Sequence, residues 1–181
     1  MFKNVLIGFV SAMSAFLTYV AMQPAAYTVT RSVLVAAPPA AVFPYIDDFR
    51  KWNAWSPWAG KDANARTAIS GPPSGVGATF AWSGNKEIGE GQMTIVESQP
   101  AERIAIRLDL VRPHSGTSGA VFTLQPEGAG TRVTWTLNGE NGFFDRAALM
   151  MVGIKLDQTV GADYEKGLAN LKAVAEAGAK G

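Results

Sequence analysis

The sequence predicts an α+β fold in which a strongly bent antiparallel sheet of about seven strands wraps around one long C-terminal helix. Residues 103–111 alternate between apolar and mostly polar side chains, so one face of this strand is buried and the other is wet, as in antiparallel sheets. Near the C-terminus, a helical stripe repeats at steps of three or four: Leu156, Val160, Tyr164, Leu168, Leu171 and Val174. A sheet with one apolar face and a helix with one apolar stripe bury each other.

The first elements are a strand and a short helix. Tyr27–Val35 is rich in β-branched residues, which favour a strand, and the run Ala-Ala-Pro-Pro at 36–39 ends it. A helix is expected to begin at these prolines, because proline fits the first helical turn. Val42 and Ile46 continue with helical spacing. Pro44 lies between them and should kink or shorten the helix.

Six further strands, a short helix and a long helix complete the predicted order. Turn residues separate strands at 66–70, 77–83, 90–98, 103–111, 119–125 and 131–138. Phe143–Ile154 predicts a short, strongly apolar helix or lid before the C-terminal helix, which Gly178 ends. Gly153, Gly161 and Gly167 either weaken this region or permit close approach of a sheet or a ligand.

The N-terminal segment predicts a membrane helix. Eighteen residues, Val5–Met22, carry no charge, which is near the length that spans the hydrocarbon core. Lys3 precedes them and places that end in the cytoplasm if the positive-inside rule applies. We therefore expect a membrane anchor at residues 1–26 and a domain at residues 27–178 outside the cytoplasm, on the periplasmic side in a Gram-negative cell.

A cleaved signal peptide is the alternative for the same segment, and it would leave a secreted or periplasmic domain. Its small-x-small cleavage sites are poor, because 21–23 ends in Gln and 24–26 begins with Pro. A buried soluble helix is a third interpretation, which the lack of a charged face disfavours.

Composition excludes several classes of chemistry. The chain has 181 residues and no cysteine, which excludes disulfide scaffolds, thiol nucleophiles and cysteine-ligated metals. Its single histidine excludes a multi-histidine metal site. Lys and Arg number 16 against 15 Asp and Glu, with no basic stripe, so nucleic-acid binding is not expected. No cofactor or metal is expected either, and the oligomeric state is left open.

Four segments in this order resemble the SRPBCC superfamily, also called START-like or helix-grip proteins. They read APPAAVFPYIDDFRKWNAWSPW, GVGATFAWSGNKEIGEGQMTIVES, GTRVTWTLNGEN and DYEKGLANLKAV. Within the superfamily the chain is similar to bacterial polyketide cyclase/dehydrase-type proteins over about residues 27–176. The resemblance implies the helix-grip fold, a hydrophobic cavity between sheet and helix, and a lipid-like or polycyclic ligand.

Large apolar side chains on the inward faces are the candidate ligand-binding residues. An apolar pocket is the default ligand site, although each such residue also suits ordinary core packing. The three tryptophans of WNAWSPW either form the cavity mouth or pin the first helix to the sheet, and at least one indole N–H should meet a polar group. The candidates are Trp52, Trp55, Phe80, Trp82, Ile106, Leu108, Trp135, Val160 and Tyr164.

Acid–base candidates are weaker. Glu90 in NKEIGEG gains a raised pKa if it points into a cavity, but a solvated turn with an ion pair is the ordinary alternative. Arg107 shares the wet face of its strand with Asp109, where pairing is common. His114 is the sole histidine and lies in a Gly/Ser-rich loop without a nucleophile elbow.

Three functional hypotheses follow. The first is binding of a hydrophobic small molecule at the membrane surface, with the membrane contacted through residues 5–22. The second is a cyclase or dehydratase that works by cavity acid–base groups without a cofactor. The third is a protein-interaction or co-chaperone-like module, which requires an exposed apolar patch instead of a cavity.

Overall fold

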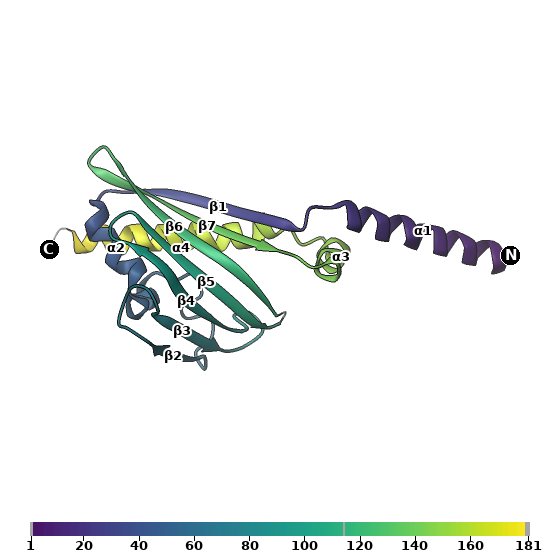
Figure 1. Ribbon diagram of the computed structural model, residues 1–181, viewed down its shortest axis with the longest axis horizontal. Coiled ribbons are helices and arrows are strands. Elements are labelled where there is room, and N and C mark those ends of the chain that lie inside the picture. Colours follow the sequence, from purple (N-terminus) through teal and green to yellow (C-terminus); the bar gives the residue numbers. More distant parts are fainter. Residues whose placement is uncertain (1, 114, 180–181) are drawn as a thin grey trace. The chain divides into compact units, whose positions relative to one another are not determined.

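The computed structural model describes residues 2–113 and 115–179. Along the chain the elements are α1 (Phe2–Met22), β1 (Ala26–Val35), α2 (Pro39–Asp47), the 3₁₀ helix η1 (Phe49–Ala54), β2 (Arg66–Ser70), β3 (Thr79–Ser83), β4 (Glu90–Gln99), β5 (Arg103–Arg112), β6 (Gly116–Glu127), β7 (Gly130–Glu140), α3 (Phe143–Val152) and α4 (Leu156–Gly178) (Figure 1). Two compact units result. One holds α1 and α3 with the residues around them, and the other holds the sheet, α2, η1 and α4.

The strands form one seven-stranded sheet in the order β1-β7-β6-β5-β4-β3-β2. Its hairpins are antiparallel, with Ile106 opposite Ala120 in β5–β6 and Ile106 opposite Ile95 in β4–β5. Register shifts at Glu90/Gly91 and Ile95/Glu97 interrupt the β4–β5 ladder, and such bulges bend a strand. The predicted α+β fold with a curved sheet is confirmed.

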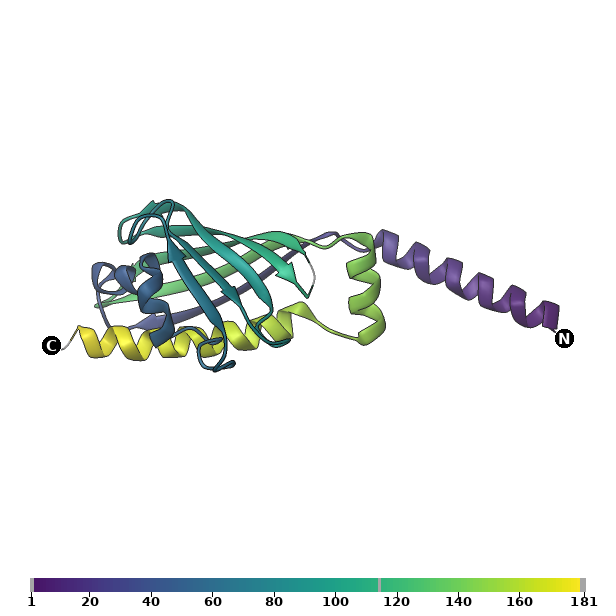
Figure 2. The same cartoon turned by 90° about the horizontal axis from the view of Figure 1, so that it is seen from below.

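The long helix α4 lies along one face of the sheet (Figure 2). Its stripe is buried at Tyr164, Leu168 and Leu171, which are at most 3% exposed. The sheet supplies the facing apolar side chains, among them Ile104 and Phe122, each 0% exposed. The core therefore forms where the period-two pattern of the strands meets the stripe of the helix.

Strand β6 is longer than the sequence predicts. Residues 116–118 belong to a Gly/Ser-rich segment that indicates a loop, yet Gly116 pairs with Leu110 and Ser118 with Leu108. Pairing with β5 overrides the low strand propensity of these residues, because strand formation depends on the neighbouring strand.

Helix α2 begins at Pro39 and is short. It contains Pro44, continues to Asp47 and is followed by η1. Trp52 in η1 and Trp55 just after it hold α2 in place. Trp52 Nε1 donates to the Ile46 carbonyl and Trp55 Nε1 donates to the Tyr45 carbonyl, each at 2.8 Å.

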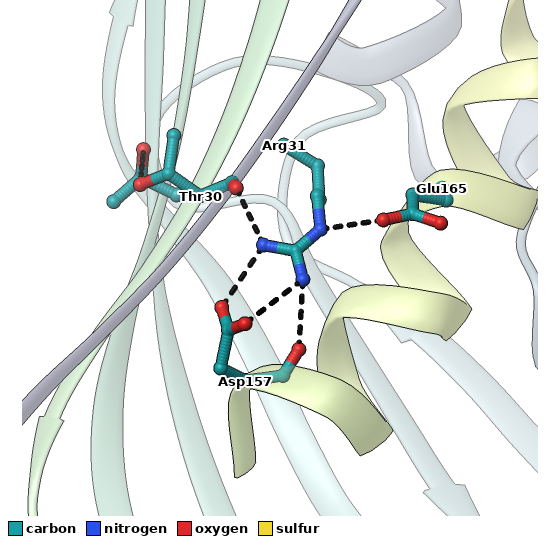
Figure 3. Close-up of polar contacts among 5 residues, drawn as sticks. Thr30, Arg31, Asp157 and Glu165 are labelled. Atoms are coloured by element: carbon teal, nitrogen blue, oxygen red, sulfur yellow. Dashed lines mark hydrogen bonds and ion pairs between the residues drawn. The ribbon is translucent and has the colours of Figure 1, made fainter. Parts of the chain in front are cut away.

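An arginine from β1 holds the N-terminal end of α4 (Figure 3). Arg31 Nη1 lies 2.9 Å from Asp157 Oδ1, and Arg31 Nε lies 2.7 Å from Glu165 Oε1. Hydrogen bonds from the guanidinium lower the pKa of Asp157, and both carboxylates raise the pKa of Arg31. A Cβ at Gly161 would overlap this guanidinium, so here the glycine permits close approach of the sheet.

The other end of α4 is tied to the end of β1. Lys172 Nζ donates to the Leu34 carbonyl at 2.8 Å, and Glu176 Oε1 accepts the Ala36 N–H at 2.7 Å. Toward the N-terminal end, Lys61 Nζ also pairs with Asp163 Oδ1 at 2.9 Å. Polar contacts therefore hold both ends of the helix against the rest of the sheet unit.

The unit of α1 and α3 is mostly uncovered. Helix α1 has 21 residues and is long and apolar enough to cross a membrane, and Val20 is its one buried residue. A signal sequence passes the same test of length and composition. The short apolar helix expected before α4 is present as α3.

Candidate ligand-binding cavity

A cavity of about 550 Å³ lies within the sheet unit. Four parts of the sheet unit line it. The sheet contributes Thr67, Phe80, Trp82, Met93, Leu108, Leu110, Ala120, Trp135 and Leu137, and α4 contributes Val160 and Tyr164. Helix η1 and the connection after it contribute Trp52, Asn53, Ser56, Trp58, Ala59, Gly60, Asp62 and Ala65, and the β3–β4 turn contributes Ile88. Its volume is within the range of small-molecule sites.

The cavity continues the apolar face of the core strands. On β5 the inward side chains Ile104 and Ile106 are buried, whereas Leu108 and Leu110 on the same face are only half-buried and line the cavity. One period-two stripe therefore belongs to the core at one end and to the cavity wall at the other. The pattern of alternation is the same at both ends, because it is set by the strand.

Stacked aromatic rings form one part of the wall. The ring centroid of Trp135 lies 3.7 Å from that of Tyr164 and 4.7 Å from that of Phe122, with interplanar angles of 12° and 27°. Trp52 and Trp58 meet Trp135 edge to face. Offset-stacked and edge-to-face ring pairs of this kind add to the stability of the packing, so these rings form a continuous aromatic wall.

Trp135 differs from its neighbours in hydrogen bonding. The indoles of Trp52, Trp55 and Trp82 donate to backbone carbonyls, the last to Ile88 at 2.9 Å. The Nε1 of Trp135 is buried and has no acceptor among the described residues. In WNAWSPW, Trp52 and Trp55 hold α2 by hydrogen bonds, and Trp52 and Trp58 line the cavity. The segment therefore has features of both interpretations, the helix clamp and the cavity mouth.

Asp62 is the acidic side chain of this lining. Its Oδ1 accepts the Asn64 N–H at 2.9 Å and its Oδ2 accepts the Asn85 N–H at 2.7 Å. Both oxygens therefore hold the backbone of two loops. These two hydrogen bonds give the Asp62 carboxylate a structural role in the cavity wall.

Most of the predicted ligand-binding residues line the cavity. These are Trp52, Phe80, Trp82, Leu108, Trp135, Val160 and Tyr164. Trp55 and Ile106 are not in the lining; each is 1% exposed and packs in the core.

Other lining residues were not foreseen from the sequence. Met93, Leu110 and Leu137 lie on the inward faces of their strands. The alternation of apolar residues identifies these faces, but it does not distinguish residues of the cavity lining from residues of the core. In the connection at 56–65, the sequence singled out only Trp58, through the cavity-mouth interpretation; the other lining residues there follow no periodicity that indicates a wall.

The acid–base candidates lie elsewhere. Glu90 accepts Arg112 Nε at 2.9 Å and the Ser83 hydroxyl at 3.2 Å, so the ion-pair interpretation fits it. Arg107 Nε lies 2.8 Å from Asp109 Oδ2 on the exposed face of β5. Neither residue is in the lining. His114 lies outside the described residues. Within residues 2–113 and 115–179, no group of three or more His, Cys, Asp or Glu side chains has the arrangement of a metal site.

Comparisons with known proteins agree with this architecture. A family model described as polyketide cyclase / dehydrase and lipid transport matches residues 26–176. A solved structure of a protein from Chromobacterium violaceum is 17% identical with a TM-score of 0.60, covering 82% of this chain and 96% of that one. An uncharacterized protein from Rhizobium leguminosarum is 17% identical with a TM-score of 0.61, covering 86% and 97%.

A third solved structure, Ara h 8.0201, is 10% identical with a TM-score of 0.59, covering 84% of this chain and 99% of that one. At these identities the likeness concerns the fold, which is the helix-grip arrangement. A comparison with curated protein sequences finds no match. The resemblance to the SRPBCC superfamily is therefore confirmed through the family match and the fold.

Proposed function

Because this chain belongs to the polyketide cyclase / dehydrase and lipid transport family, we propose that it binds a hydrophobic small molecule, lipid-like or polycyclic, in the cavity between the sheet and α4. Family membership indicates hydrophobic-ligand binding or cyclase chemistry. The observation that carries the choice is the lining itself, which is dominated by apolar and aromatic side chains from every strand between β3 and β7.

Binding is favoured over catalysis by the state of the polar groups. Acid–base catalysis needs a titrating group that reaches the ligand. Asp62 holds two backbone N–H groups, while Glu90 and Arg107 form ion pairs outside the lining. We therefore assign Asp62, Glu90 and Arg107 no reaction step, and His114, the remaining candidate, lies outside the described residues.

The ligand is proposed to come from a membrane. Helix α1 supplies an anchor of suitable length, and an apolar molecule that moves from a bilayer into an adjacent cavity avoids water. We assign residues 1–26 to the anchor and residues 27–178 to the binding domain, outside the cytoplasm because Lys3 precedes the span.

Native mass spectrometry of the full chain extracted from its own membrane tests the proposal. The expected result is a bound apolar molecule whose mass identifies its class. A chain that carries no such molecule, and that also takes up no hydrophobic probe, contradicts the proposed binding. N-terminal sequencing tests the anchor separately, since a mature N-terminus near Tyr27 means cleavage of a signal peptide.

A further inference from the structure

Helix α3 is apolar and uncovered. None of its ten residues is buried. Phe144 is 84% exposed, Met151 76% and Val152 71%, and Ile154 just after the helix is 46% exposed. A cluster of large apolar side chains of this kind is unfavourable in water, and in soluble proteins it marks a surface that contacts something apolar.

The charges of this segment are confined to its two ends. Asp145 Oδ2 accepts the Gly142 N–H at 3.2 Å and so caps the helix, and Arg146 Nη1 donates to the Gln23 carbonyl at 2.7 Å. Between Ala147 and Ile154 the sequence has no charged residue, and Lys155 follows. Residues 147–154 therefore carry no charged side chain whose desolvation would oppose transfer into an apolar medium.

Local contacts hold α3 to the C-terminal end of α1. The two helices belong to one compact unit and contact each other. Arg146 binds the first carbonyl beyond α1, a position where a cation is favourable. The Asn141 N–H donates to the Ala25 carbonyl at 2.9 Å. The exposed apolar surface of α3 thus continues the exposed apolar surface of α1.

We infer that α3 is a second contact with the lipid bilayer, lying in the headgroup and upper acyl region of the leaflet in which α1 ends. This inference rests on the proposed anchoring by α1. A bilayer suits α3 because the helix packs beside the end of α1, which has the length and composition of a membrane span and also exposes large apolar side chains. Ten helical residues span about 15 Å, too little to cross the hydrocarbon core, so the segment stays in one leaflet.

Depth-dependent fluorescence quenching tests this inference on the full chain. The chain has no cysteine, so a single introduced cysteine takes a nitrobenzoxadiazole label without background. The variants are Met151→Cys in α3, Ala15→Cys in the middle of α1, and Ser74→Cys in an exposed loop of the sheet unit. Each is reconstituted in vesicles of phosphatidylcholine and phosphatidylglycerol that carry a doxyl quencher near the headgroup or deep in the acyl chain.

The expected pattern is strongest quenching of the Met151→Cys label by the shallow doxyl, strongest quenching of the Ala15→Cys label by the deep doxyl, and no loss at Ser74→Cys. Phe144→Cys repeats the α3 measurement at an independent position. Quenching at Ala15→Cys without quenching at both α3 sites overturns the inference and leaves the anchor intact. A blue-shifted α3 label without quenching overturns it as well, because protein then covers α3.

Two further outcomes also count against the inference. Equal quenching at all positions, Ser74→Cys included, overturns it because α3 is then no different from the domain surface. Absence of quenching at Ala15→Cys overturns the proposed anchoring, and the inference falls with it.

Discussion

Substitution of Ala120 by Phe should block ligand uptake without dismantling the fold. Ala120 lies on β6 in the cavity lining, so a larger side chain there projects into space rather than into packed atoms. A phenyl group displaces a ligand segment that would bury on the order of 100 Å², which at about 25 cal/mol per Å² is about 2.5 kcal/mol of lost binding free energy. That loss corresponds to a roughly sixty-fold weaker affinity.

The assay is energy transfer from tryptophan to N-phenyl-1-naphthylamine in the detergent-solubilised full chain. All five tryptophans lie between residues 52 and 135, in the sheet unit, and four of them line the cavity, so probe bound there lies close to several donors. The matched control is Val121→Phe, the next residue on β6, whose side chain points to the opposite face of the sheet.

Ala120→Phe should weaken the probe signal while Val121→Phe leaves it unchanged, with thermal melting confirming that both variants fold. Equal affinities for the wild type and Ala120→Phe would refute the assignment of the cavity as the binding site.

Three further predictions concern what holds the cavity in place. Trp52→Phe removes the donor to the buried Ile46 carbonyl and should lower the free energy of unfolding in urea by about 1–3 kcal/mol, so an unchanged midpoint argues against this hydrogen bond as a clamp. Gly161→Ala should lower the melting temperature, although such a change normally stabilises a helix by about 1 kcal/mol, because the new Cβ displaces Arg31; a raised melting temperature contradicts this. Asp157→Asn should destabilise the protein at pH 7 and progressively less below pH of about 4, because an acid with a lowered pKa contributes stability above its unfolded-state value of about 3.9 and loses it as pH falls through the folded value. Melting curves across pH check this, and a difference from wild type that persists unchanged at low pH is the contrary result.

Local patterns were sufficient for the elements and their order. Strand β5 and helix α4 each bury one face, and the spacing of apolar residues in each segment shows which face it is. Both elements are present as predicted. Helix α2 begins at the prolines as expected and contains Pro44. The extension of β6 to Gly116 was missed because it arises from pairing with β5 and not from its own residues.

The candidate site was only partly predictable, because it too depends on contacts between elements that are distant in the sequence. Leu108 and Ile106 sit on one face of one strand with the same alternation, yet the first lines the cavity and the second lies in the core. The sequence pattern identifies the inward face but holds no information on how far α4 and η1 extend across it. The same holds for Glu90, whose ion pair with Arg112 depends on the register of β4 against β5.

The sequence by itself determined the fold class, the inward faces of the strands, the apolar N-terminal helix and the family, because each depends on local periodicity or on ordered motifs. Tertiary structure alone decided where the inward face becomes a cavity, that Gly161 makes room for Arg31, and that α3 lies uncovered beside the end of α1. These features depend on the distance between elements remote in the chain, and that distance results from the packing of all of them together.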